Sequence, residues 1–139
     1  EGTHLGQSIW LREVAGREAG DAPVVDLASE RANADAVRGL VAAGTINAVH
    51  DISDGGLLVT LAEMALAGNT GAALDITLTT ASAFGEDQAR YVVTAPAGTD
   101  IPGATRIGTV GGDTVADVAL DMLRKAHEGF FPALMNNEL

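Results

Sequence analysis

The stretch over residues 48–69, AVHDISDGGLLVTLAEMALAGN, constrains the fold more than any other part of the chain. Its first residues, 48–51, predict a short strand, and residues 57–67 predict a helix whose apolar surface only Thr60 and Glu63 interrupt. A helix with so little polar surface has to be covered on most of its sides, so we expect it to belong to the core. The rest of the chain is therefore predicted to be built around one strand–turn–helix unit.

The turn of this unit carries the first candidate site. Four polar residues collect there and two glycines follow: His50, Asp51, Ser53, Asp54, Gly55 and Gly56. The first turn of a helix leaves N–H groups unpaired, which suits an anion or a metal-bound phosphate, and glycine lets backbone come near a ligand. Asp51 and Asp54 are close enough for both to approach one Mg²⁺, which prefers carboxylate and phosphate oxygens. In the structural alternative, which stays open, Asp54 or Ser53 caps the helix. Asp51 then bonds the turn and His50 fills core space.

Two further segments could contact a ligand. In FGEDQAR, over residues 84–90, the side chains of Glu86, Gln88 and Arg90 could hydrogen-bond a polar ligand or its phosphate. The alternative is a solvated loop that leads into a strand. Residues 6–8, GQS, could also meet a phosphate, although ordinary loops have the same composition.

Composition bounds the possible partners. The 139 residues suffice for one domain with a real core, and the formal net charge of −11 disfavours nucleic acid and anionic membranes as partners. The absence of cysteine excludes disulfides, thiolate metal sites and a cysteine nucleophile, and suits a cytoplasmic setting. No apolar run approaches the roughly 20 residues of a membrane span. The chain begins with Glu1 in a polar loop, so we expect a piece of a longer protein.

The remaining segments alternate between helix and strand patterns. Asp26 is the expected N-cap of a helix over residues 27–43, and Thr114 the expected N-cap of a helix over 114–126. Strands are expected over residues 73–79, 89–95 and 104–110, and a tail over 127–139 whose Phe130, Phe131 and Leu134 dock on the body. This order predicts an α/β or α+β class with a single mixed sheet covered by helices, in one domain over residues 1–139.

Five segments resemble one known family. HDISDGGLLVTLAEMALAG, over residues 50–68, is similar to a segment near the end of the synthetase subunits of phosphoribosylformylglycinamidine synthases, which belong to the AIR synthase-related proteins. The other four occur in the same order as in that family: HLGQSIWLRE, FGEDQARYVV, RIGTVGGD and HEGFFPALMN. The first segment is specific, and HLGQSIWLRE and FGEDQARYVV are moderately so. The resemblance implies an AIR synthase-related C-terminal domain that is a fragment of a larger subunit.

The resemblance also implies an activity for the full subunit, an ATP-dependent C–N ligase of purine biosynthesis. In this family ATP and Mg²⁺ activate the formyl amide oxygen of formylglycinamide ribonucleotide, and ammonia from a glutaminase subunit displaces the phosphate. The catalytic histidine and most ATP ligands lie in other domains, so the resemblance implies that this chain is inactive alone and holds no catalytic residue. Its implied partners are the remaining domains of the subunit, the glutaminase subunit and a small-molecule nucleotide. The alternative is a non-catalytic nucleotide-binding or assembly module of another AIR synthase-related enzyme.

The resemblance assigns roles at the candidate site. Asp51 is the counterpart of a Mg²⁺-binding aspartate in the first half of the family's subunit, and Glu86, Gln88 and Arg90 match a first-half segment that touches substrate. In the second half, the site is implied to hold a nucleotide without turnover. The chain departs from the family in its short connection PAGTDIPGAT, over residues 96–105, and in a short stretch before FGEDQ. We therefore expect one side of the sheet to be less completely covered.

Overall fold

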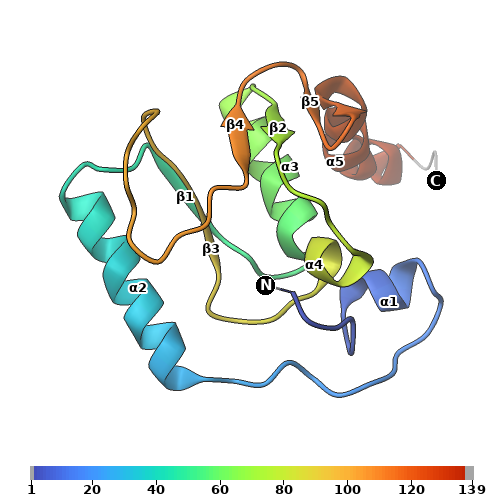
Figure 1. Cartoon of the computed structure of the whole chain (residues 1–139). Helices are drawn as coiled ribbons and strands as arrows, with labels where there is room; N and C mark the ends of the chain where they lie inside the picture. Colours follow the sequence, from blue (N-terminus) through green and yellow to red (C-terminus); the bar gives the residue numbers. More distant parts are fainter. Residues whose placement is uncertain (1, 137–139) are drawn as a thin grey trace. The chain divides into compact units, whose positions relative to one another are not determined.

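The computed structural model describes residues 2–136 (Figure 1). The fold consists of two compact units, one comprising the residues up to Thr60 together with Thr77–Arg106, the other Leu61–Ile76 together with the residues from Ile107 onward. The expectation of one domain over residues 1–139 stays a prediction. Within residues 2–136, no helix combines the length and the apolar character that crossing a membrane requires.

The first unit contains a pair of strands that are far apart in the sequence. β1 (Ala48–Asp51) pairs with β3 (Tyr91–Thr94) in antiparallel orientation, and Asp51 lies opposite Tyr91. The N–H of Ile52 then donates to the carbonyl oxygen of Arg90 at 2.8 Å, so the contact continues past the end of both strands. The helices of this unit are α1 (Ile9–Glu13), α2 (Leu27–Ala42), α4 (Thr80–Phe84) and the first part of α3 (Gly56–Gly68).

The second unit contains the rest of α3, a small mixed sheet and the long helix α5 (Leu120–Met135). The strand order in the sheet is β4-β2-β5-β6, with one parallel pair, β2 and β5, among antiparallel ones. Its strands are short: β2 (Ala72–Leu74), β4 (Gly108–Val110), β5 (Thr114–Val115) and β6 (Val118–Ala119). The mixture of helices and strands confirms the predicted α+β class.

The central helix was predicted correctly as a core element. α3 begins at Gly56 and ends at Gly68, and its Leu57, Thr60 and Leu61 are buried. Thr60 is only 1% exposed, and its hydroxyl donates to the carbonyl oxygen of Asp51 at 3.2 Å. The polar interruption in the apolar helix thus serves to tie the helix to the end of β1.

The predicted helix over residues 27–43 is also confirmed, because both of its end signals are local. The Asp26 carboxylate accepts from the N–H groups of Ala28 and Ser29, and Gly44 follows the helix with φ +65. No residue of α2 is buried. The helix is therefore defined by its ends more than by packing.

Four expectations about the strands were wrong in detail, and the strand expected over 104–110 begins only at Gly108. The described residues form two sheets instead of a single one. The strand expected over 73–79 ends at Leu74, and Thr79 instead caps the unpredicted helix α4 with a capping box to Ser82. The strand expected over 89–95 begins only at Tyr91, because Ala89 has φ +62, a left-handed conformation that a strand cannot contain.

The helix expected over residues 114–126 was wrong at its start. Thr114 lies in β5, and Ala116 and Asp117 both have positive φ, as the two-residue turn of a β5–β6 hairpin requires. The helix begins at Leu120 instead and runs on to Met135, through most of the expected tail.

The expected docking of the tail is also not found. Phe130, Phe131 and Leu134 are 51%, 70% and 47% exposed. The two phenylalanine rings contact each other edge to face, with centroids 5.4 Å apart. Residues 137–139 of the expected tail lie outside the described part of the chain.

Candidate functional site

A pocket of about 420 Å³ lies in the first unit, at the carboxyl end of β1. It brings together the two segments that the sequence singled out separately, the turn after β1 and the loop before β3. Its lining also includes residues from α2 and from the segment before it. The lining residues are Pro23, Glu30, Asp51, Ile52, Ser53, Asp54, Glu86, Gln88, Ala89, Arg90 and Tyr91.

The antiparallel pairing of β1 with β3 is what joins the two segments. Asp51 is the last residue of β1 and lies opposite Tyr91, the first residue of β3. The chain leaves β1 toward Asp54 and enters β3 from Glu86, so both connections lie at the same end of the ladder. Six of the nine predicted site residues therefore line one pocket: Asp51, Ser53, Asp54, Glu86, Gln88 and Arg90.

Asp51 and Asp54 keep their carboxylates accessible. Both residues are exposed, and the Asp51 side chain is 62% exposed. Nδ1 of His50 lies 2.7 Å from the Asp51 carbonyl oxygen and 3.5 Å from Asp51 Oδ1. His50 itself is not among the lining residues and lies next to the pocket through its contact with Asp51.

The two glycines of the turn approach other atoms of the chain and not the pocket. Gly56 has φ +73, and a Cβ there would lie 2.7 Å from the Cα of Phe84 and 2.8 Å from the carbonyl oxygen of Gly85. Gly55 has φ +80, and a Cβ there would meet the Val59 side chain at 2.6 Å. Neither glycine lines the pocket. Their role is to let the turn pack closely against α3 and against the start of the 85–90 loop.

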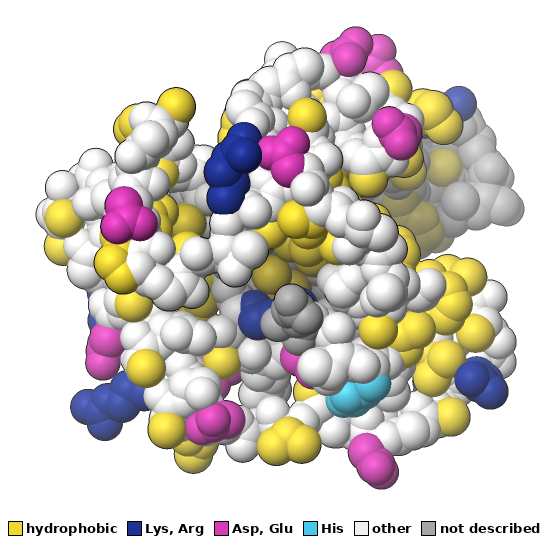
Figure 2. All heavy atoms as spheres, viewed as in Figure 1, with side chains coloured by type: hydrophobic (Ala, Val, Ile, Leu, Met, Phe, Trp, Pro, Cys, Tyr) yellow, Lys and Arg dark blue, Asp and Glu magenta, His cyan; other side chains and the backbone are white. Residues whose placement is uncertain are grey.

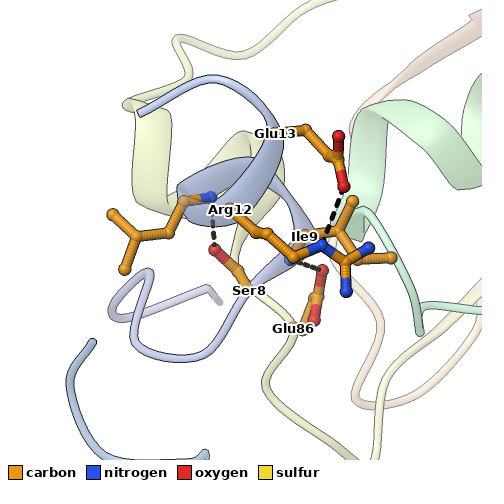
Figure 3. A network of polar contacts seen from close by, with 6 residues as sticks. Ser8, Ile9, Arg12, Glu13 and Glu86 are labelled. Atoms are coloured by element: carbon orange, nitrogen blue, oxygen red, sulfur yellow. Dashed lines mark hydrogen bonds and ion pairs between the residues drawn. The ribbon is translucent and has the colours of Figure 1, made fainter. Parts of the chain in front are cut away.

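Glu86 connects three segments of the first unit. Its Oε1 accepts a hydrogen bond from the N–H of Ile9 at 2.8 Å and another from the N–H of Gly55 at 2.9 Å. Figure 3 shows Glu86 pointing toward the first turn of α1, with a dashed line to Ile9. This geometry was not anticipated, because a sequence does not show which amides a loop carboxylate will meet.

The Arg90 side chain hydrogen-bonds to the backbone of its own loop. Its Nε donates to the carbonyl oxygen of Asp87 at 2.8 Å and its Nη2 to that of Gly85 at 2.6 Å. Burial lowers the pKa of the Arg90 guanidinium below its usual value, and the nearby Asp87 carboxylate acts in the opposite direction. The side chain thus shapes the loop with two of its donor groups.

Asp87 holds the N-terminal segment to the same loop. Its carboxylate accepts from the Thr3 hydroxyl at 2.6 Å and from the Thr3 N–H at 3.0 Å. Burial acts to raise the pKa of Asp87, but the hydrogen bonds from Thr3 and the charge of Arg90 outweigh it, so this pKa lies below its usual value.

Helix α2 supplies a wall of the pocket that sequence reasoning missed. Oε1 of Glu30 accepts from the N–H of Ala89 at 2.8 Å, and Nδ2 of Asn33 donates to the Ala89 carbonyl oxygen at 2.8 Å. The N–H and the carbonyl group of Ala89 are thus both hydrogen-bonded to α2, which stabilises the left-handed conformation of this residue at φ +62. The only sequence signal was the i,i+3 spacing of Glu30 and Asn33, which places them on one face of a helix.

The third candidate segment, residues 6–8, has a structural role. Ser8 is buried and caps α1 by accepting from the N–H of Leu11, and Gln7 donates to the carbonyl oxygen of Gly20. None of the three residues lines the pocket. The ordinary-loop alternative therefore describes this segment better.

The pocket is strongly acidic. Four of its lining residues are carboxylates, Glu30, Asp51, Asp54 and Glu86, against the single cation Arg90. Among residues 2–136 there is no group of three or more His, Cys, Asp or Glu residues arranged to hold a metal ion by themselves. Mg²⁺ usually takes only one or two protein carboxylates and completes its shell with water and substrate phosphates. Asp51 and Asp54 are two such carboxylates on the lining of the pocket.

The family comparison identifies the domain type. The model for the C-terminal domain of AIR synthase related proteins matches residues 2–121. Both strands of the pocket and both of its loops lie inside the matched range.

Individual relatives carry the same name, phosphoribosylformylglycinamidine synthase subunit PurL. That of Novosphingobium aromaticivorans is 69% identical over 131 residues, which are 94% of this chain and 18% of the relative. That of Zymomonas mobilis is 51% identical over 148 residues, which cover 95% of this chain and 20% of the relative. That of Bradyrhizobium diazoefficiens is 47% identical over 154 residues, which cover 96% of this chain and 21% of the relative. The chain spans about a fifth of the length of these relatives.

The lengths of these alignments bear on the short connections expected from the sequence. The matches to Zymomonas and Bradyrhizobium extend over 148 and 154 residues, more than the 139 residues of this chain. Those two relatives therefore carry residues that this chain lacks.

Proposed function

Because the chain belongs to the family of AIR synthase related proteins, as their C-terminal domain, we propose that it serves as the C-terminal domain of a phosphoribosylformylglycinamidine synthase subunit. The full subunit would then convert formylglycinamide ribonucleotide and glutamine-derived ammonia to formylglycinamidine ribonucleotide with ATP. The chain alone would be inactive, because the catalytic histidine implied by the family lies in other domains. It would work in the cytoplasm with those domains and with the glutaminase subunit.

The observation that carries this proposal is the 69% identity to the Novosphingobium subunit over 94% of this chain. Identity at that level leaves little room for a different pattern of buried and pocket residues. The five segments quoted above extend over both units, so the support does not depend on the pocket alone.

We further propose that the pocket binds a nucleotide phosphate together with Mg²⁺. Asp51 would bind the metal, with Asp54 close by, and Ser53, Gln88 and Arg90 would hydrogen-bond phosphate or sugar oxygens. Mg²⁺ would supply the positive charge that a phosphate needs beside four carboxylates. The chain's own contribution would be to bind and orient the ligand through these side chains.

A chimera tests the role in the full subunit. This chain replaces the corresponding fifth of the Novosphingobium subunit, and the chimera is expressed in a bacterium that lacks its own subunit and requires purine. We expect growth without purine and formation of formylglycinamidine ribonucleotide by the purified chimera with its glutaminase partner. A chimera that is soluble, assembles with that partner and makes no product would overturn the proposal.

Calorimetry tests the pocket. We expect ADP with Mg²⁺ to bind the 139-residue chain, and Asp51→Asn to weaken binding by about tenfold, as for the loss of one carboxylate ligand. The matched control is Asp100→Asn, which removes the same charge from an exposed loop residue outside the pocket and should leave the affinity unchanged. Equal loss in both variants would mean that only overall charge matters.

A second candidate function is a nucleotide-binding or assembly module of another AIR synthase-related enzyme. The family match favours it as well, because the matching model describes the C-terminal domain of AIR synthase related proteins in general and not of one enzyme. It predicts the same calorimetric result but no growth from the chimera, so the two experiments together separate the candidates.

A further inference from the structure

One oxygen atom of Glu86 accepts two main-chain hydrogen bonds from segments that are distant in sequence. The N–H of Ile9 donates to Oε1 at 2.8 Å and the N–H of Gly55 at 2.9 Å. Ile9 is the first residue of α1, and Gly55 lies in the turn between β1 and α3. Both bonds are part-buried and charge-assisted, which makes them stronger than ordinary amide hydrogen bonds.

The turn that Glu86 holds is also closed by a hydrogen bond from the N–H of Gly56 to the carbonyl oxygen of Ser53 at 3.0 Å, and it packs against α3 and the 85–90 loop. Two consecutive glycines, Gly55 and Gly56, follow Asp54 with φ +80 and φ +73. Glycine allows many backbone conformations, so the turn needs contacts from outside itself to stay in one of them. Ser53 and Asp54, which precede the glycines, line the pocket.

We infer that Glu86 is a positioning residue of the pocket and not a ligand of the metal or the phosphate. Its carboxylate fixes the Asp54–Gly55 peptide against α1 and against the 85–90 loop. The two walls of the pocket, the turn after β1 and the loop before β3, are thereby held at a constant separation. This inference rests on the proposed nucleotide site and changes the role that the family resemblance implies for Glu86.

The neighbouring contacts of the loop support this division of roles. Arg90 donates to the carbonyl oxygens of Gly85 and Asp87, on either side of Glu86, so the backbone that carries Glu86 is itself held. Because its backbone is held and its Oε1 already accepts from the N–H groups of Ile9 and Gly55, this oxygen is occupied by contacts within the protein. The Asp51 side chain is 62% exposed, and its Oδ1 lies 3.5 Å from His50 Nδ1, farther than the two amides lie from Glu86.

Two substitutions distinguish positioning from direct ligation. Glu86→Gln keeps an acceptor oxygen at the same distance from the backbone but removes the negative charge that makes a carboxylate a strong ligand of Mg²⁺. Glu86→Ala removes both. Amide hydrogen exchange by NMR is measured at Ile9 and Gly55, and the affinity for ADP with Mg²⁺ is measured by calorimetry. Glu13→Ala is the matched control, because Glu13 pairs with Arg12 in the same network in Figure 3 without contacting Gly55.

If Glu86 positions the turn, Glu86→Ala speeds exchange at both amides and weakens ADP binding, each by about tenfold, the effect of one lost charge-assisted hydrogen bond. Glu86→Gln should keep both values within about threefold of the original chain, because a neutral acceptor retains part of each bond. Glu13→Ala should change neither.

Two results would overturn the inference. Glu86→Gln that weakens binding as much as Glu86→Ala, with both amides still protected, would make Glu86 a direct ligand. Unchanged exchange in Glu86→Ala would show that the carboxylate does not hold the turn. If the unaltered chain binds no nucleotide, the proposed site fails, while the exchange rates still decide whether Glu86 fixes the turn. Should Glu86→Ala not fold, a loss of ADP affinity in Glu86→Gln well above about threefold, with both amides still protected, would make Glu86 a direct ligand.

Discussion

At the scale of single residues, the turn after β1 is defined by what cannot fit there. Gly56 has φ +73, and a side-chain Cβ at this position would lie within 2.8 Å of backbone atoms of Phe84 and Gly85. The sequence pattern had connected the two glycines with a ligand, whereas the structure connects them with the protein's own chain. A glycine can therefore be required beside a site without touching anything bound in it.

Gly56→Ala should consequently be strongly destabilising. The left-handed conformation costs about 1 kcal/mol for alanine. The overlap with the backbone of Phe84 and Gly85 adds about 1–3 kcal/mol, because backbone atoms cannot rotate out of the way as a side chain can. Gly98→Ala is the matched control: Gly98 has φ +83, but nothing lies within 4 Å of its Cβ position. Chemical denaturation should show a loss for Gly56→Ala well above that for Gly98→Ala, and equal losses would contradict the steric argument.

At the scale of the elements, helices with local end signals were predictable and hairpins with unusual turns were not. Asp26 and Gly44 define the ends of α2 from within a few residues of each end. The β5–β6 hairpin has Ala116 and Asp117 at its turn, both with positive φ, where asparagine and glycine are usual. An alanine in that position gives no sequence signal of a turn. Thr114 and Asp117 resembled a capping box instead, so a helix was expected there.

The same substitution should therefore have opposite effects in the hairpin and in the helix. Ala116→Gly relieves a backbone conformation with φ +47 and should stabilise by about 0.5–1 kcal/mol. Ala126→Gly, at an exposed position inside α5, should destabilise by about 1 kcal/mol. Thermal unfolding of the two variants measures both signs, and a shift of the same sign in both would count against the assigned hairpin.

At the scale of the whole molecule, charge is the dominant feature. The formal net charge is −11, and acidic side chains are spread over the visible face in Figure 2. Large hydrophobic side chains such as Leu27, Phe131 and Met135 are also more than two-thirds exposed. Like charges repel one another in the compact state, so the net charge opposes folding while it favours solubility.

Salt should accordingly stabilise this chain. Raising NaCl from about 0.02 M to about 0.5 M shortens the range of the repulsion, and we expect Tm to rise by several degrees. The rise should shrink by about a third in a variant with Asp21→Asn and Asp100→Asn, since self-repulsion scales with the square of net charge. Differential scanning calorimetry measures Tm, and a Tm that falls or stays constant with added salt would be incompatible with this account.

The sequence by itself determined the strand–turn–helix unit, the ends of α2, the α+β class and the family, because each depends on residues close together in the chain or on a matched order of segments. Six of the nine predicted site residues also line one pocket, and their binding roles stay predictions.

Only the tertiary structure decided that these groups belong to one pocket, because the pairing of β1 with β3 is long-range and leaves no periodic signal in either segment. It also decided the direction of the Glu86 carboxylate, toward two amides, and the contribution of Glu30 from α2. Local sequence specifies how a segment folds, while the contacts between distant segments depend on which of them pack together.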